Sequence, residues 1–163
     1  MSMLELLEAS AFASWVRESD SVWAYPTVLF LHTLGLAFLV GLNTAVDLRL
    51  LGVARSWPLA SVVRFMPVMW AGFWINALSG AVLLAADATT KTMMPVFWVK
   101  LAFVAVGMMH MAWLKPAVIR VAVSAGDRLP PHARLVAAGS LLAWTGATVA
   151  GRLMAYLGPG STF

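Results

Sequence analysis

The sequence predicts an all-α integral membrane protein, an up-down four-helix bundle preceded by a short amphipathic helix. Of the 163 residues, 61% are hydrophobic and only 11% are charged, and the mean hydropathy is +0.85. A soluble domain of this size cannot bury so much apolar surface. The charged residues also gather between four long apolar runs. A helix needs about 20 mainly apolar residues to cross a bilayer, and each run is long enough.

The spanning helices are expected at about residues 22–50, 60–86, 95–122 and 132–157. Transmembrane strands would instead alternate between apolar and polar residues over about ten positions. The three connections between the runs are short and contain Pro, Gly or Asp, so consecutive helices should be antiparallel. Pro67 and Pro116 fall inside the second and third helices and are expected to kink them.

Residues 1–20 are expected to form a short amphipathic helix in the membrane interface, ahead of a transmembrane domain at residues 21–163. Ser2 and Glu5 have the spacing of a capping box, and apolar residues follow at helical spacing. A secretory signal would begin with basic residues, whereas this segment carries Glu5 and Glu8.

The positions of the Lys and Arg residues predict the orientation and explain the net charge of +4 without a nucleic-acid partner. Most of the eleven basic residues flank the connection between the first and second helices and that between the third and fourth. Both termini are therefore expected outside the cytoplasm. The absence of cysteine from the sequence excludes disulfides, thiolate metal sites and covalently attached c-type haem.

Polar residues within the expected spans are the candidate functional residues, because ionisable groups are costly in lipid. At 1.5 Å per residue, His32 and Asn76 should lie about 15 Å from the outer face, and Lys100 and Arg152 about 7–8 Å. Four groups from four helices are thus expected to converge in the outer half of the bundle. His110 should lie deeper, about 22 Å from the same face.

The two histidines suggest a b-type haem or another metal site, because neutral imidazole ligates iron, copper and zinc. His32 and His110 lie on helices that run parallel in an up-down bundle, with Asn76 nearby and Lys100 and Arg152 placed to meet the haem propionates. The depths of the two histidines differ by roughly 7 Å, so a site with His32 as single ligand stays open.

Other readings remain open. The run from Met108 to Met111 contains soft ligands suited to Cu(I), although Met is also an ordinary packing residue. A metal or small-solute carrier could use the outer polar groups. A cofactor-free accessory or assembly subunit, or a homodimer, could dock through the small residues at four-residue spacing from Gly139 to Ala155. No catalytic constellation stands out, so the sequence does not decide whether the protein is an enzyme.

Near the inner ends of the first two helices, Asp47 is expected to form a structural ion pair with Arg49 or Arg64. Residues two apart on a helix do not face one another, which disfavours Arg49 as the direct partner.

Several short stretches carry a resemblance: His32-Thr33-Leu34-Gly35, Asp47-Leu48-Arg49-Leu50-Leu51-Gly52, Gly72 with Gly80, and Phe97-x-x-Lys100-Leu101. In these the chain resembles uncharacterised bacterial four-helix inner-membrane proteins, from about residue 20 to the end of the third helix and more weakly in the fourth. It is distantly similar to copper-resistance membrane proteins and membrane b-type cytochromes. The resemblance implies the fold and a bacterial inner membrane, and no activity.

The same resemblance singles out His32, Asp47, Arg49 and Lys100 as positions that match the family pattern. It gives His110 less support, because similar proteins more often carry another polar residue there. His32 is therefore the stronger ligand candidate.

Overall fold

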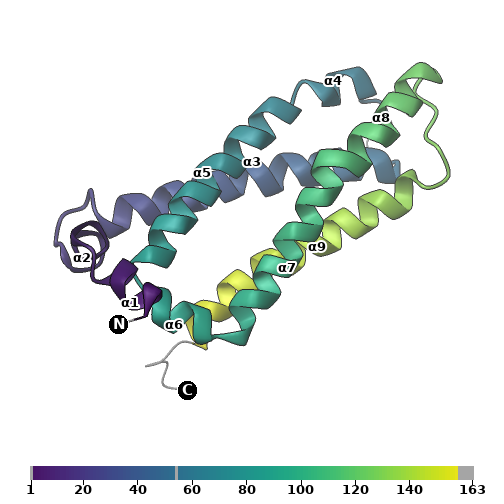
Figure 1. The fold of residues 1–163 in the computed structure, drawn as a ribbon. Coiled ribbons are helices and arrows are strands. Elements are labelled where there is room, and N and C mark those ends of the chain that lie inside the picture. Colours follow the sequence, from purple (N-terminus) through teal and green to yellow (C-terminus); the bar gives the residue numbers. More distant parts are fainter. Residues whose placement is uncertain (1, 54, 158–163) are drawn as a thin grey trace.

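Four long apolar helical segments run the length of the molecule in the computed structural model, which describes residues 2–53 and 55–157 (Figure 1). Each segment is long and apolar enough to cross a membrane, which confirms the all-α fold with four spanning helices. The first is α3 (Tyr25–Leu51), and the last is α9 (Ala133–Tyr156). The second consists of α4 (Leu59–Val63) and α5 (Met66–Ala85), and the third of α7 (Pro95–Met109), a π-helical turn η1 (His110–Leu114) and α8 (Lys115–Ser124).

The N-terminal segment forms two short helices where the sequence suggested one, α1 (Met3–Glu8) and α2 (Ala11–Glu18). The capping box is confirmed, because Ser2 and Glu5 bond to each other's backbone N–H groups. A second cap follows at Ser10, whose Oγ accepts a hydrogen bond from the Ala13 N–H at 3.3 Å. A serine cap satisfies a free N–H at a new helix start, and this divides the segment in two.

Both interior prolines coincide with interruptions of their helices. Pro67 lies in the first turn of α5, directly after the break that separates α5 from α4. Pro116 lies in the first turn of α8, directly after η1. Proline has no N–H to donate to the preceding turn, so the regular α-helical hydrogen bonding is lost there.

The four segments pack as two pairs. α3 lies along α5, α7 lies along α9, and α3 joins the pairs by contacting α9 (Figure 1). Glycines allow the first pair to approach closely: a Cβ atom on Gly72 would lie 2.9 Å from the Leu39 backbone nitrogen and 3.0 Å from the Gly35 carbonyl oxygen. Small residues have this role wherever helices pack tightly in lipid.

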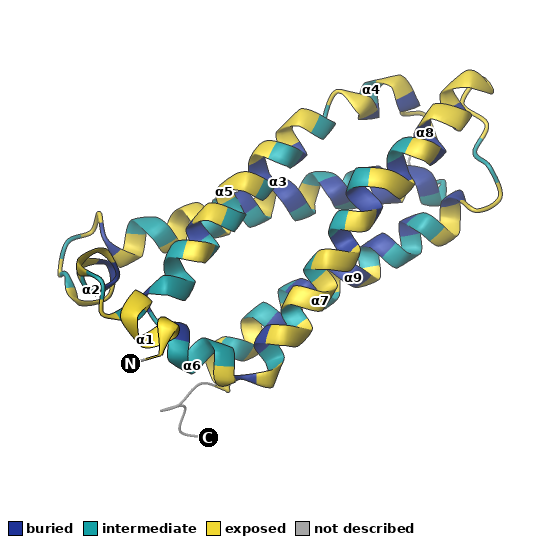
Figure 2. Cartoon of the chain, in the orientation of Figure 1, coloured by how far each residue is buried: buried dark blue, intermediate teal, exposed yellow. Residues whose placement is uncertain are grey.

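The small residues of α9 also pack within the chain. Ala143 and Ala147 are buried, and the ring of Phe103 on α7 lies over Gly146. Buried residues face the interior of the bundle and exposed residues, most of them apolar, face outward (Figure 2). Such an outer surface suits a bilayer, because the exposed apolar side chains would contact lipid instead of water.

The two ends of the bundle differ. One end of the bundle carries α1, α2, α6 (Ala88–Met93) and the C-terminal end of α9, and is called the α6 end. The other end carries α4, the C-terminal end of α8 and the connection from α8 to α9, and is called the α4 end (Figure 1). Each end has a hollow lined by charged side chains.

Candidate functional site

A cavity of about 460 Å³ opens at the α6 end between α3, α5, α7 and α9. This α6-end cavity has both polar and apolar walls. Its polar lining comes from Arg17, Tyr25, His32, Asp87, Lys91 and Lys100. Its apolar lining includes Leu83, Leu84, Phe97 and Met154. The mixture suits a ligand that has one charged end and one apolar end.

His32 is held in place by α5. Its Nδ1 donates a hydrogen bond to the Asn76 carbonyl oxygen at 2.9 Å, and the Asn76 side-chain amide donates to the His32 carbonyl oxygen at 2.7 Å. Gly80 leaves room for the ring, because a Cβ there would lie 3.0 Å from the His32 Cε1 atom. A proton on Nδ1 leaves Nε2 with a free lone pair, and the Asn76 amide nitrogen approaches it at 3.5 Å. The predicted proximity of these two residues is thus present.

Lys100 enters the α6-end cavity from α7 and is half-buried. Its aliphatic stem passes Gly151 of α9, where a Cβ would lie 3.6 Å from the Lys100 Cε atom. Within residues 2–53 and 55–157, no carboxylate forms an ion pair with Lys100. The other two cations of the cavity are paired. Lys91 Nζ lies 3.2 Å from Asp87 Oδ2, and Arg17 Nη2 lies 2.8 Å from Glu18 Oε1.

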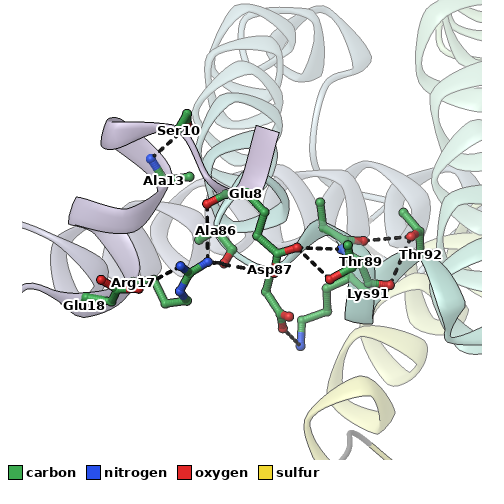
Figure 3. Close-up of polar contacts among 11 residues, drawn as sticks. Glu8, Ser10, Ala13, Arg17, Glu18, Ala86, Asp87, Thr89, Lys91 and Thr92 are labelled. Carbon is green, nitrogen blue, oxygen red and sulfur yellow. Dashed lines mark hydrogen bonds and ion pairs between the residues drawn. The ribbon is translucent and has the colours of Figure 1, made fainter. Parts of the chain in front are cut away.

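The N-terminal helices are attached beside the cavity by polar contacts (Figure 3). The Thr89 hydroxyl donates to Glu8 Oε2 at 2.6 Å, and Arg17 Nη1 donates to the Ala86 carbonyl oxygen at 3.0 Å. The hydrogen bond with Glu18 raises the pKa of Arg17 above its usual value, so this guanidinium stays charged. These contacts hold the ion pair of Arg17 and Glu18 at the rim of the α6-end cavity.

Arg152 does not join this group. Its side chain is exposed, and the cavity is lined instead by its neighbour Gly151. Successive residues on a helix point about 100° apart, so only one of the two can face the interior. Of the four groups expected to converge, the structure brings together His32, Asn76 and Lys100.

His110 lies elsewhere in the bundle. Its Nδ1 donates to the Val106 carbonyl oxygen at 2.8 Å, and a Cβ on Gly139 would lie 2.8 Å from its Nε2 atom. The imidazole therefore packs directly on α9, whereas His32 packs on α5. The two histidines do not form a ligand pair in this arrangement. Among the described residues, no three His, Asp or Glu side chains are grouped to hold a metal ion.

The methionines near His110 also diverge. Met111 is fully buried in the core, while Met109 is exposed on the outer surface. Successive side chains on a helix point in different directions, and Met108 packs against the apolar core of which Met111 is part.

A buried polar cluster occupies the bundle interior toward the α4 end. Lys115 Nζ lies 2.7 Å from Asp47 Oδ1, and the Ser140 hydroxyl donates to Asp47 Oδ2 at 2.8 Å. The Asn43 amide donates to Asp47 Oδ2 at 3.2 Å, and its carbonyl oxygen accepts from Lys115. All four side chains are inaccessible to solvent. The charges of Lys115 and Asp47 compensate one another. Asp47 Oδ2 accepts two hydrogen bonds, whereas Asp47 Oδ1 faces the Lys115 ammonium group without accepting a hydrogen bond from a described residue.

The ion pair expected between Asp47 and Arg49 or Arg64 is not formed. Asp47 faces Lys115, while Arg49 points to the other side of α3 and lies 3.8 Å from Asp127. Arg64 is exposed and forms no ion pair with a described residue. The spacing of two residues between Asp47 and Arg49 turns their side chains apart.

Sequence reasoning missed three members of the buried polar cluster, namely Asn43, Lys115 and Ser140. One signal was available: Asn43 and Asp47 are four residues apart, so they share one face of the predicted helix. Their partners come from two other helices, and spacing within one helix cannot identify those.

No protein-family model, curated protein or solved structure matches the chain. The protein is a multi-pass, all-α membrane protein, and the geometry of the α6-end cavity is the guide to its activity.

Proposed function

We propose that this membrane protein binds a small organic anion, a carboxylate with an apolar tail, in the α6-end cavity. The observation that carries the proposal is the Lys100 ammonium group, which lines the cavity and has no carboxylate partner within residues 2–53 and 55–157. A charged side chain within a membrane-spanning helix is costly unless it is compensated, and such residues commonly mark ligand or ion sites. A ligand carboxylate would supply the missing charge.

The charges around the cavity favour one negative charge on the ligand. Lys91 is compensated by Asp87, and Arg17 by Glu18. Lys100 is then the one cation of the described lining that lacks a carboxylate. A charge-assisted hydrogen bond from an ammonium to a carboxylate is about twice as strong as a neutral one, and low polarity strengthens it further.

The apolar wall favours a ligand with a hydrocarbon portion. Phe97 and Met154 lie on α7 and α9, and Leu83 lies on α5. Burial of each additional methylene group contributes about 0.8 kcal/mol of transfer free energy. Affinity should therefore rise with chain length until the cavity is filled.

The site supports binding from one side of the membrane in this conformation. Deeper in the bundle the backbones of α3 and α5 touch at Gly35 and Gly72, which leaves no room for a solute between these two helices. The distribution of Lys and Arg favours an α6 end outside the cytoplasm, and in that orientation the ligand would enter from the outer side. Transfer across the membrane would need rearrangement of the helix pairs.

The proposal is tested by isothermal titration calorimetry, which measures the dissociation constants of straight-chain carboxylates of two to ten carbons for the full chain in mild detergent. Lys100→Gln should weaken binding about ten- to hundredfold, which is the range expected for one charge-assisted hydrogen bond. Lys100→Arg should retain most of the affinity because it keeps the charge. Arg152→Gln is the matched control, since Arg152 is an exposed cation near the same end that does not line the cavity. Absence of saturable binding by any of the carboxylates, or equal effects of Lys100→Gln and Arg152→Gln, would contradict the proposal.

A b-type haem with His32 as single protein ligand is the second candidate. The specific observation that favours it is the hydrogen bond from His32 Nδ1 to the Asn76 carbonyl oxygen, because metal-ligating histidines commonly donate their other ring N–H to such an acceptor. Asn76 would then orient the imidazole, and Lys100 would meet a propionate. Bound haem would supply one-electron chemistry.

Absorption spectra of the oxidised and dithionite-reduced protein, produced with ample haem, decide this second candidate. Haem binding through His32 predicts a Soret band that is lost in His32→Ala and kept in His110→Ala. A colourless wild-type protein would remove the haem candidate and leave anion binding unaffected.

A further inference from the structure

A second hollow, of about 530 Å³, lies at the α4 end and is called the α4-end pocket. Three arginines from separate parts of the chain line it. Arg49 belongs to the last turn of α3, Arg55 to the connection that follows, and Arg134 to the first turn of α9. Asp127, from the connection between α8 and α9, contributes one carboxylate. The pocket therefore has an excess of positive charge.

Arg49 is a fixed part of the pocket floor. Its side chain is only 5% exposed, and its Nε donates a hydrogen bond to the Trp57 carbonyl oxygen. Its Nη2 lies 3.8 Å from Asp127 Oδ2, at the outer limit of an ion pair. A guanidinium held this firmly loses little conformational freedom when it meets a ligand.

Asp127 also accepts a backbone hydrogen bond, which reduces its capacity to neutralise the arginines of the pocket. Its Oδ2 accepts a hydrogen bond from the Leu59 backbone N–H at 3.1 Å, which ties the connection between α8 and α9 to the start of α4. This one carboxylate serves Leu59 and, more weakly, Arg49.

The other two arginines of the pocket have no carboxylate partner among the described residues. Arg55 uses its Nε to donate to the Gly52 carbonyl oxygen at 3.0 Å. That bond orients its guanidinium within the connection. Arg134 is exposed at the start of α9. Two guanidinium groups thus face the pocket with hydrogen-bond donors to spare.

We propose that the α4-end pocket binds a phosphate group, carried either by an anionic phospholipid headgroup or by a soluble phosphate compound. Guanidinium groups match the tetrahedral oxygens of phosphate with paired, charge-assisted hydrogen bonds. Arg49, Arg55 and Arg134 converge in one concave site. Three guanidinium groups suit a phosphate ligand, with its several oxygens, better than a ligand with a single carboxylate.

The position of the pocket along the membrane normal supports both sources. α3 ends at Leu51 and α9 begins at Ala133, so the pocket lies where two spanning helices end and the headgroup region is expected. The distribution of Lys and Arg favours a cytoplasmic location for this end, where anionic lipids are concentrated and soluble phosphates are abundant. Basic pockets between transmembrane helices on that side commonly take lipid headgroups.

The lipid source is tested with the full chain in nanodiscs and by native mass spectrometry after mild delipidation. The probes are phosphatidylglycerol and, as a neutral control, phosphatidylcholine. The double variant Arg55→Gln/Arg134→Gln should weaken retention of phosphatidylglycerol about ten- to hundredfold. The matched control is Arg64→Gln/Arg120→Gln, which removes two exposed arginines that do not line the pocket and should change retention less than about threefold.

The soluble source is tested by titrating inorganic phosphate and glycerol 3-phosphate into the detergent-solubilised protein, with the same two double variants. Saturable binding that is lost only in Arg55→Gln/Arg134→Gln supports a site for soluble phosphate, and retention of phosphatidylglycerol alone supports a headgroup site. Failure of all three probes, or equal losses in the two double variants, overturns the proposal. Because these substitutions lie at the opposite end from Lys100, carboxylate titrations of the same variants separate the two proposals.

Discussion

The ammonium group of Lys115 lies 2.7 Å from the carboxylate of Asp47 in the bundle interior, and neither side chain is accessible to solvent. Asp47 is on α3 and Lys115 begins α8, so the pair ties two of the spanning segments together. Ser140 extends the link to α9 by donating to Asp47. A buried ion pair of this kind favours one arrangement of the helices, because any shift would leave a charge without its partner.

Removal of one partner should therefore be far more costly than removal of both. Lys115→Met and Asp47→Leu should each lower the unfolding free energy by about 3 kcal/mol or more, because each leaves one buried charge uncompensated. The double variant should recover most of the loss. Thermal unfolding in detergent and a double-mutant cycle measure this coupling. Additive losses would show that the two charges are not coupled.

The close approach of α3 and α5 predicts a contrast between two glycines. Gly72→Ala should destabilise the protein by about 1–3 kcal/mol, because the new Cβ would lie 2.9 Å from the Leu39 backbone nitrogen and would force the helices apart. Gly41→Ala is the control. No described residue lies within 4 Å of a Cβ there, so the gain in helix propensity should leave stability unchanged or raise it by up to about 1 kcal/mol. Equal behaviour of the two variants in thermal unfolding would contradict the observed packing.

The N-terminal helices should detach when Glu8 is truncated. Glu8→Ala removes the acceptor of two hydrogen bonds from Thr89, at 2.6 Å from its hydroxyl and 3.3 Å from its backbone nitrogen. Each bond contributes about 0.5–1.5 kcal/mol, so amide exchange across α1 and α2 should accelerate about fivefold or more. Glu18→Ala removes only an exposed ion pair with Arg17 and should leave exchange nearly unchanged. Unchanged exchange in Glu8→Ala would show that other contacts hold the segment.

Asp127 has a positive φ and accepts a hydrogen bond from the Leu59 backbone N–H. Two substitutions should separate the energetic cost of the backbone conformation from the contribution of the hydrogen bond. The φ of Asp127 is +64°, a left-handed conformation that Asn tolerates better than Ala does. Asp127→Asn retains an oxygen that can accept from the Leu59 N–H, so the cost should stay below about 1 kcal/mol. Asp127→Ala loses the bond and keeps the strain, so unfolding in denaturant should show a loss of about 1–3 kcal/mol. A larger loss for Asn than for Ala would contradict this interpretation.

Sequence patterns were most informative about features that depend on one helix alone, namely the positions and boundaries of the spanning segments. The apolar runs predicted all four spans, and the observed segments from Tyr25 to Leu51 and from Ala133 to Tyr156 begin and end within three residues of expectation. Hydrophobic length and the missing N–H of proline act locally, so spacing along the chain reveals them. The break at Ser10 depends on a competing local cap, which composition alone does not rank against a continuous helix.

Contacts between helices were predictable only in part. Equal depth in antiparallel helices correctly brought His32 beside Asn76. Depth alone gives no rotation about the helix axis, so Arg152 was expected inside and is found outside. The pairing of Asp47 with Lys115 also depends on how α3 and α8 are rotated. That rotation is determined by packing over the whole bundle, including the position of η1.

The most direct test of anion binding is an experimental structure of the full chain with saturating octanoate. A carboxylate at the α6-end cavity predicts ligand density with an oxygen within about 4 Å of Lys100 Nζ and the hydrocarbon chain against Phe97 and Met154. The same experiment on Lys100→Gln, with octanoate at about ten times the wild-type Kd, should show clearly weaker ligand density in that cavity. Density for octanoate only at the α4-end pocket, or unchanged density in Lys100→Gln, would contradict the assignment of Lys100 as the anion-binding residue.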